Sequence, residues 1–176
     1  MTFRKTLIQY AESRVNSIPI SNSPFPQADS IDRIIELSKL LTKKPMGIDE
    51  VADALAFVGR QSSYYLNACS YLGLIEKKKV GKDTLWFAST IAMKIFAKDK
   101  DFQVKQICIL LLSIDSCAKV FLRLQSDIHL DKSEIFTIFD RSHDSLYCTG
   151  ETTKRRATTV GTWARWVDAI ATEIDN

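Results

Sequence analysis

Apolar side chains recur every three or four positions over most of this 176-residue chain, and this spacing predicts helices. The longest such stripe runs through Ala157, Val160, Ala164, Val167 and Ala171. The pattern predicts helices over residues 3–18, 31–42, 48–57, 60–72, 90–96, 103–114, 116–125, 132–139 and 151–174. One segment differs, because the stretches 74–79 and 84–88 flank a turn at Gly81-Lys82-Asp83 and predict a β-hairpin.

Residues 48–90 place these elements in an informative order. Two short helices are separated by a turn at Val58-Gly59, Gly73 ends the second helix, and the hairpin follows. Helix, turn, helix and hairpin in this order are typical of a winged helix-turn-helix, whose second helix can enter the major groove of DNA.

We therefore predict a mainly α fold with two consecutive helix-turn-helix units, the first a winged helix with a small β-hairpin. The expected domains are an N-terminal helix and linker (1–30), the winged helix-turn-helix domain (31–100) and a second helical, helix-turn-helix-like domain (101–176). The charged joint Lys98-Asp99-Lys100-Asp101 marks the second boundary.

Composition narrows the class of protein. Hydrophobic residues make up 45% of the chain and charged residues 26%, which is ordinary for a globular protein. No apolar run approaches the ~20 residues that span a bilayer, and the N-terminus lacks an apolar signal core. We expect a cytoplasmic protein with no membrane partner.

Charge is unevenly distributed along the chain. Residues 1–100 contain 15 Lys and Arg against 10 Asp and Glu, whereas residues 101–176 contain 9 against 11. The second half nevertheless holds the basic cluster Lys154-Arg155-Arg156. Because local placement of charge decides contact with phosphates, this distribution is compatible with nucleic-acid binding, and equally with a solvated surface.

The predicted helix 60–72 has two distinct faces. Helical spacing directs Tyr65, Ala68, Cys69 and Leu72 inward, and leaves a polar face that contains no Asp or Glu, with Tyr64 and Tyr71 at its edges. Arg, Asn and Ser side chains reach base edges and phosphates, and an acid here would meet the phosphates at close range. The candidate DNA-binding residues in this region are Arg60, Gln61, Ser63, Tyr64 and Asn67 on the helix and Lys77, Lys78, Lys79 and Lys82 on the hairpin.

Two motifs resemble the winged-helix DNA-recognition region of type II restriction endonucleases. The first is Gly59-Arg60-Gln61 with Tyr64-Tyr65-Leu66-Asn67-Ala68-Cys69-Ser70-Tyr71-Leu72-Gly73-Leu74, and the second is Thr152-Thr153-Lys154-Arg155-Arg156-Ala157-Thr158-Thr159-Val160-Gly161-Thr162-Trp163-Ala164-Arg165-Trp166-Val167. Together they cover roughly residues 31–174. The resemblance implies the target-recognition part of a restriction-modification or defence protein, with a nuclease domain or subunit elsewhere.

The predicted last helix supplies a second set of candidates. Helical spacing places Thr152, Arg155, Thr159 and Thr162 away from the apolar stripe, and the helix N-terminus offers backbone N–H groups to a phosphate. The DNA-binding candidates here are Thr152, Thr153, Lys154, Arg155, Arg156 and Thr159. Trp163 and Trp166 are expected in the core, and Gly161 within the helix indicates close packing or a bend.

The sequence offers little for catalysis or metal binding. The four cysteines lack Cys-x-x-Cys spacing, and no catalytic motif, metal site or cofactor is predicted. Glu76-Lys77-Lys78 matches a minimal acid-x-lysine nuclease pattern, but no Pro-Asp pair lies a short distance upstream of it.

The expected partner is double-stranded DNA, and a homodimer is compatible with the sequence. Three alternatives stay open: a transcriptional regulator, a fragment of a metal-dependent nuclease that uses Glu76, and a winged-helix protein-interaction module. The last would expose an apolar patch around Tyr64 and Tyr71.

Overall fold

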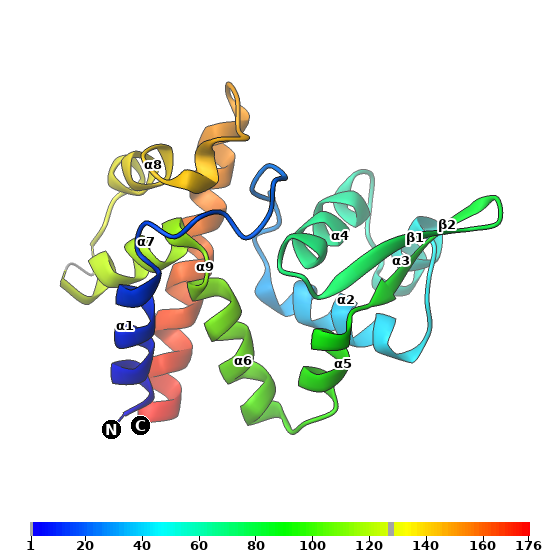
Figure 1. Cartoon of the computed structure of the whole chain (residues 1–176), viewed down its shortest axis with the longest axis horizontal. Coiled ribbons are helices and arrows are strands. Elements are labelled where there is room, and N and C mark those ends of the chain that lie inside the picture. The colour runs from blue at the N-terminus through cyan, green and yellow to red at the C-terminus, as the bar shows by residue number, and fades with distance from the viewer. Residues whose placement is uncertain (1, 127–128) are drawn as a thin grey trace. The chain divides into compact units, whose positions relative to one another are not determined.

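The computed structural model describes residues 2–126 and 129–176. In these residues the chain is mainly helical with one two-stranded antiparallel sheet, which confirms the predicted fold class (Figure 1). It forms two compact units. The winged-helix unit comprises Pro26–Gln103, and the helical unit comprises Met1–Phe25 together with Val104–Asn176.

The winged-helix unit follows the predicted order of elements. It contains α2 (Ile31–Lys43), α3 (Ile48–Leu55), α4 (Gln61–Tyr71), β1 (Ile75–Val80), β2 (Asp83–Ala88) and α5 (Thr90–Phe96). The Ser30 hydroxyl accepts a hydrogen bond from Arg33 N–H at the start of α2, and the Ser89 hydroxyl accepts one from Ala92 N–H at the start of α5. These caps satisfy backbone donors that a helix leaves unpaired, so they fix where both helices begin.

An isolated backbone bridge ties the connection between α2 and α3 to the hairpin. Met46, between α2 and α3, pairs antiparallel with Trp86 of β2, with N–H···O distances of 3.2 Å and 2.9 Å. Trp86 also lies opposite Lys77 of β1. Strand β2 is therefore paired on both sides at Trp86, and the segment that leads into α3 is anchored to the sheet.

The turn between α3 and α4 is closed by an aromatic pair. Phe57 stacks on Tyr65 with ring centroids 5.0 Å apart and an interplanar angle of 4°, and the Arg33 guanidinium lies 5.6 Å from the Phe57 centroid. Tyr65 was predicted to point inward but is half-buried in this stack, whereas Leu66 occupies the core. The Tyr65 hydroxyl also accepts a hydrogen bond of 3.4 Å from Ser30 N–H. Tyr65 therefore contacts other segments of the unit as predicted, but it is only partly covered, because its stacking partner Phe57 lies in a turn outside the helix.

The helical unit contains the remaining elements. They are α1 (Phe3–Arg14), most of α6 (Lys100–Leu112), α7 (Asp115–Ser126), α8 (Lys132–Asp140), the 3-10 turn η1 (His143–Ser145) and α9 (Thr152–Asp175). The chain passes between the units within α6, a few residues beyond the predicted joint.

Helix α1 is shorter than the apolar spacing predicts. It ends at Arg14, because Asn16 adopts a left-handed conformation with φ of 63°. The Asn16 N–H then donates to the Asp115 carboxylate at 2.6 Å.

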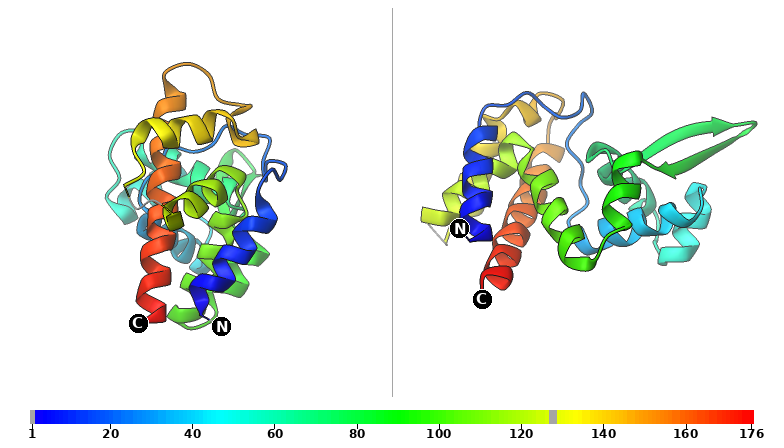
Figure 2. Two further views of the ribbon diagram at one scale, coloured as in Figure 1. Left: turned by 90° about the vertical axis from the view of Figure 1, so that its left-hand side faces the viewer. Right: turned by 60° about the horizontal axis from the view of Figure 1, so that its bottom comes forward.

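The N-terminal segment is part of the helical unit, in contrast to the separate segment 1–30 expected from the sequence. Leu7 and Ala11 are buried where α1 packs on α7 and α9, and the two chain ends lie beside each other (Figure 2). Arg4 binds Asp168 of α9. Asp175 accepts hydrogen bonds from the N–H groups of Phe3 and Arg4 at 2.7 Å and 3.0 Å.

An aromatic cluster forms the centre of the helical unit. Phe25 packs against Trp163 and Phe139 with centroid distances of 5.1 Å and 5.6 Å, and all three side chains are fully buried. The prediction that Trp163 belongs to the core is confirmed, and Trp166 is half-buried.

Candidate nucleic-acid interface

The outward face of α4 is polar and open. Arg60, Gln61 and Asn67 are exposed, whereas Ser63 and Tyr64 are half-buried. Within the described ranges, the side chains of Arg60 and Asn67 make no hydrogen bond or ion pair. Their donors and acceptors are therefore available to an external partner.

Gln61 also has a local role. Its Oε1 atom accepts a hydrogen bond of 2.9 Å from Val58 N–H and so holds the turn that leads into α4. A contact from Gln61 to a base would therefore use the amide nitrogen.

The edge of α4 differs from the prediction at Tyr71. This side chain is 5% exposed, because α4 packs against α2 on one side and β1 on the other. Tyr64 is half-buried. The apolar patch around Tyr64 and Tyr71 that a protein-interaction module would expose is consequently not formed.

The four hairpin lysines are exposed but differ in their surroundings. Lys78 forms an ion pair of 2.8 Å with Glu76 and lies over the Phe87 ring. Lys77 lies over the Trp86 ring, with 5.4 Å from Nζ to the centroid. Such contacts hold the ammonium groups against the sheet.

Lys79 and Lys82 form no ion pair in the described part of the chain. Lys79 lies opposite Thr84, and Lys82 follows Gly81 in the turn that joins β1 to β2. Gly81 has a φ of 64°, a conformation that glycine adopts without a steric penalty. These two lysines are the hairpin cations best suited to bind a phosphate.

The start of α9 presents only part of its predicted set. Thr152, Lys154 and Arg155 are exposed. Thr153 and Thr159 are 9% and 1% exposed, so both side chains are covered, and the expectation that Thr159 faces away from the core is wrong. Both are covered because α9 packs on α7 and α8 as well as α1, which buries a wider strip than its apolar stripe indicates.

Arg156 is partly buried in the helical unit. Its side chain is half-buried, and its Nε atom is buried without a hydrogen-bond partner among the described residues. Burial raises the pKa of the neighbouring Cys148 thiol, and the positive charge of Arg156 partly opposes that shift. Arg156 is therefore less accessible to a phosphate than Lys154 and Arg155.

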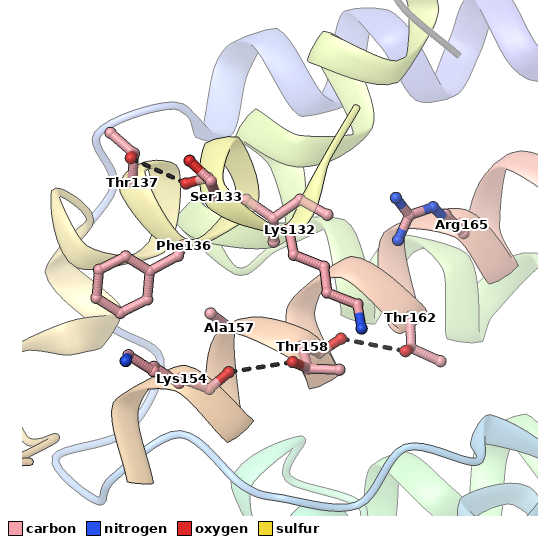
Figure 3. Close-up of a pocket in the computed structure, with 10 residues that line it drawn as sticks. Lys132, Ser133, Phe136, Thr137, Lys154, Ala157, Thr158, Thr162 and Arg165 are labelled. Carbon is pink, nitrogen blue, oxygen red and sulfur yellow. Dashed lines mark hydrogen bonds between the residues drawn. The ribbon is translucent and has the colours of Figure 1, made fainter. Parts of the chain in front are cut away.

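A groove between α8 and α9 was not predicted from the sequence. It has a volume of about 560 Å³ and is lined by Lys132, Ser133, Ile135, Phe136, Thr137, Lys154, Ala157, Thr158, Thr162 and Arg165 (Figure 3). The one sequence signal was Gly161, whose predicted close packing is confirmed. A Cβ there would lie 2.9 Å from Cδ1 of Ile135.

The described ranges give little support for metal binding, for nuclease catalysis or for a membrane-spanning helix. They contain no group of three or more His, Cys, Asp or Glu side chains placed to hold a metal ion. Glu76, the candidate nuclease acid, lies on the exposed hairpin and pairs with Lys78. No helix in the same ranges is both long enough and apolar enough to cross a membrane.

Comparison with known families gives one match. A model for a domain of unknown function, DUF7226, covers residues 33–172, from α2 to α9. The chain belongs to this family. No curated protein and no solved structure matches the chain. The resemblance to restriction endonucleases therefore stays a prediction.

Proposed function

We propose that this protein binds double-stranded DNA with sequence preference through its winged-helix unit. The observation on which the proposal rests is the outward face of α4. It holds Arg60 and Asn67 without internal partners and has no carboxylate. A helix that enters a major groove needs such a face, because its donors must meet base edges while phosphates lie close on either side.

The helix and the hairpin have different roles in this proposal. Arg60 and Asn67 read base edges, since Arg pairs with guanine and Asn with adenine in bidentate geometry. Lys79 and Lys82 bind phosphates beside the site, which adds affinity without sequence preference. Thr152, Lys154 and Arg155 at the start of α9 offer a further, independent set of phosphate contacts.

The biological setting is the target-recognition part of a restriction-modification or defence protein in the cytoplasm. The support is the resemblance of residues 59–74 and 152–167 to recognition regions of type II restriction endonucleases. A nuclease domain or subunit, and a homodimer that reads a symmetric site, belong to the same proposal.

The test is selection from a randomised duplex pool with the full chain, followed by affinity measurements at two salt concentrations. We expect an enriched sequence and weaker binding at the higher salt concentration, because binding releases counterions. Arg60→Ala and Asn67→Ala should each cost about 1–3 kcal/mol for the enriched site and less for random DNA.

Lys94→Ala is the matched control, because Lys94 is exposed on α5 of the same unit and outside the proposed surface. It should leave the preference unchanged. Absence of binding at low salt, or binding unaffected by Arg60→Ala combined with Arg155→Ala, would contradict the proposal.

A further inference from the structure

The groove between α8 and α9 has an apolar floor. Ile135 and Ala157 are buried there, and the half-buried Phe136 ring adds an aromatic surface from α8 (Figure 3). Because Gly161 has no Cβ, the Ile135 side chain packs directly on α9 where it lines the groove. Its volume of about 560 Å³ is in the range of small-molecule sites.

The charges around this floor are all positive. Lys132, Lys154 and Arg165 line the groove, and its lining contains no Asp or Glu. Lys132 and Lys154 form no ion pair within the described residues, and Arg165 is oriented by a hydrogen bond of 2.8 Å to Leu130 O. Three cations without a carboxylate favour an anionic ligand.

The hydroxyl groups of the groove act mainly as acceptors. Thr158 donates to Lys154 O and Thr162 donates to Thr158 O, each at 3.1 Å, while Thr137 donates to Ser133 O at 2.9 Å. With their hydrogens committed to the backbone, the three oxygens can accept bonds from N–H groups of a ligand.

We propose that this groove binds a nucleoside phosphate. Such a molecule combines the three features that the groove complements: an anionic phosphate, a flat ring and ring N–H donors. Lys132 and Arg165 hold the phosphate at one end, the base packs against Phe136 at the other, and Thr158, which lies between them, accepts a hydrogen bond from an N–H group of the base (Figure 3). This site does not depend on DNA binding by the winged-helix unit.

Isothermal titration of the full chain with adenosine, guanosine, cytidine and uridine monophosphates tests the proposal. At least one nucleotide should bind. Its parent nucleoside, which lacks the phosphate, and inorganic phosphate, which lacks the base, should each bind roughly tenfold more weakly. Failure of all four to bind at millimolar concentration would overturn the proposal.

Variants locate the site. Lys132→Met and Phe136→Ala should each weaken nucleotide binding about tenfold, and Thr158→Val should weaken it while preserving side-chain shape. Lys5→Met on α1 is the control, because Lys5 is exposed and outside the groove. Circular dichroism checks that each variant is folded.

Duplex DNA is the competing occupant. The proposal is wrong if Lys132→Met and Phe136→Ala leave nucleotide binding unchanged. It is also wrong if the native chain binds no nucleotide and Lys132→Met abolishes its binding to duplex DNA. Duplex binding that survives Lys132→Met, together with loss of nucleotide binding, supports it. Failure of duplex binding to the native chain would affect only the DNA proposal.

Discussion

Gly161 and Ile135 lie so close together that a Cβ on Gly161 would require the Ile135 side chain to shift. A Cβ on Gly161 would lie 2.9 Å from Cδ1 and 3.4 Å from Cγ2 of Ile135, which is buried on α8. Glycine within a helix costs about 1 kcal/mol relative to alanine. In α9 that cost is offset by direct packing of the two helices.

This relationship predicts coupling between the two positions. Gly161→Ala should lower the free energy of unfolding in the native background, because the added methyl group overpacks the contact. In the Ile135→Val background, which lacks Cδ1, the same change should stabilise the protein by up to about 1 kcal/mol. Urea unfolding of the four proteins measures a coupling of about 1 kcal/mol or more, whereas additive effects would show that the contact relaxes freely.

The hairpin lysines should differ in their effect on DNA binding. Lys79→Ala removes a cation without an internal partner, so the slope of log affinity against log salt should become shallower by about 0.9. Lys78 is paired with Glu76 at 2.8 Å, so Lys78→Ala should change the slope less and serves as the matched control. Fluorescence anisotropy over a salt series measures both. Equal slopes for the two variants would argue against the ion pair as the cause.

Thiol reactivity should report on the packing of each unit. Burial raises the pKa of Cys69 and of Cys108 to about 12 and moves that of Cys117 upward as well. At pH 8 only on the order of one in ten thousand thiols with a pKa of 12 is ionised, and burial also blocks access. We therefore expect a thiol reagent to modify Cys148, which is half-buried, well before the other cysteines.

The Cys148→Ser variant should lose this first reaction and keep the slow ones. In concentrated urea all four cysteines should react at similar rates. Rapid reaction of Cys69 in the native chain would mean that the winged-helix unit opens readily.

The contact between the ends of α1 and α9 should depend on pH. The Arg4 backbone N–H, together with that of Phe3, lowers the pKa of the Asp175 carboxyl. A carboxyl with a lowered pKa stabilises the folded state above its usual pKa of about 4, and this contribution is lost as the pH falls through the lowered value. Asp175→Ala should therefore lower the free energy of unfolding at pH 7, and it should lower it less at a pH below the lowered pKa of Asp175.

Thermal unfolding at a series of pH values measures this difference. Glu173→Ala provides the control, since Glu173 is exposed on α9 and makes no hydrogen bond to α1 in the described ranges. A difference between native and Asp175→Ala proteins that does not change with pH would assign the effect to packing.

The sequence predicted local structure better than long-range contacts. Apolar spacing, Gly73 and the charged hairpin were sufficient to place α4, β1 and β2 within one or two residues. The Met46–Trp86 bridge is an isolated residue pair, because Met46 does not belong to a strand. No periodic pattern in the sequence could therefore predict it. Such a contact depends on how secondary-structure elements pack against one another, and the spacing of apolar residues within one element does not specify that packing.

The candidate site shows the same division. Arg60, Asn67, Lys79 and Lys82 are exposed as predicted, because their elements have one open face. Thr159 was misplaced because α9 contacts α1, α7 and α8 at once, so side chains off the apolar stripe are also covered. The residues of α8 that line the groove could not be predicted from the sequence, because they come close to α9 only when the two helices pack together.

The division of the chain into a continuous winged-helix unit and a helical unit built from two separate stretches sets an order of events during synthesis. Residues 26–103 hold all the strands and helices of the winged-helix unit, so this unit can form while later residues are still being added. Helix α1 precedes this unit in the chain, but Leu7 and Ala11 are covered only once α7 and α9 have been added. The apolar face of α1 therefore stays uncovered until α9 is complete, and it is exposed to aggregation or to chaperones during that time.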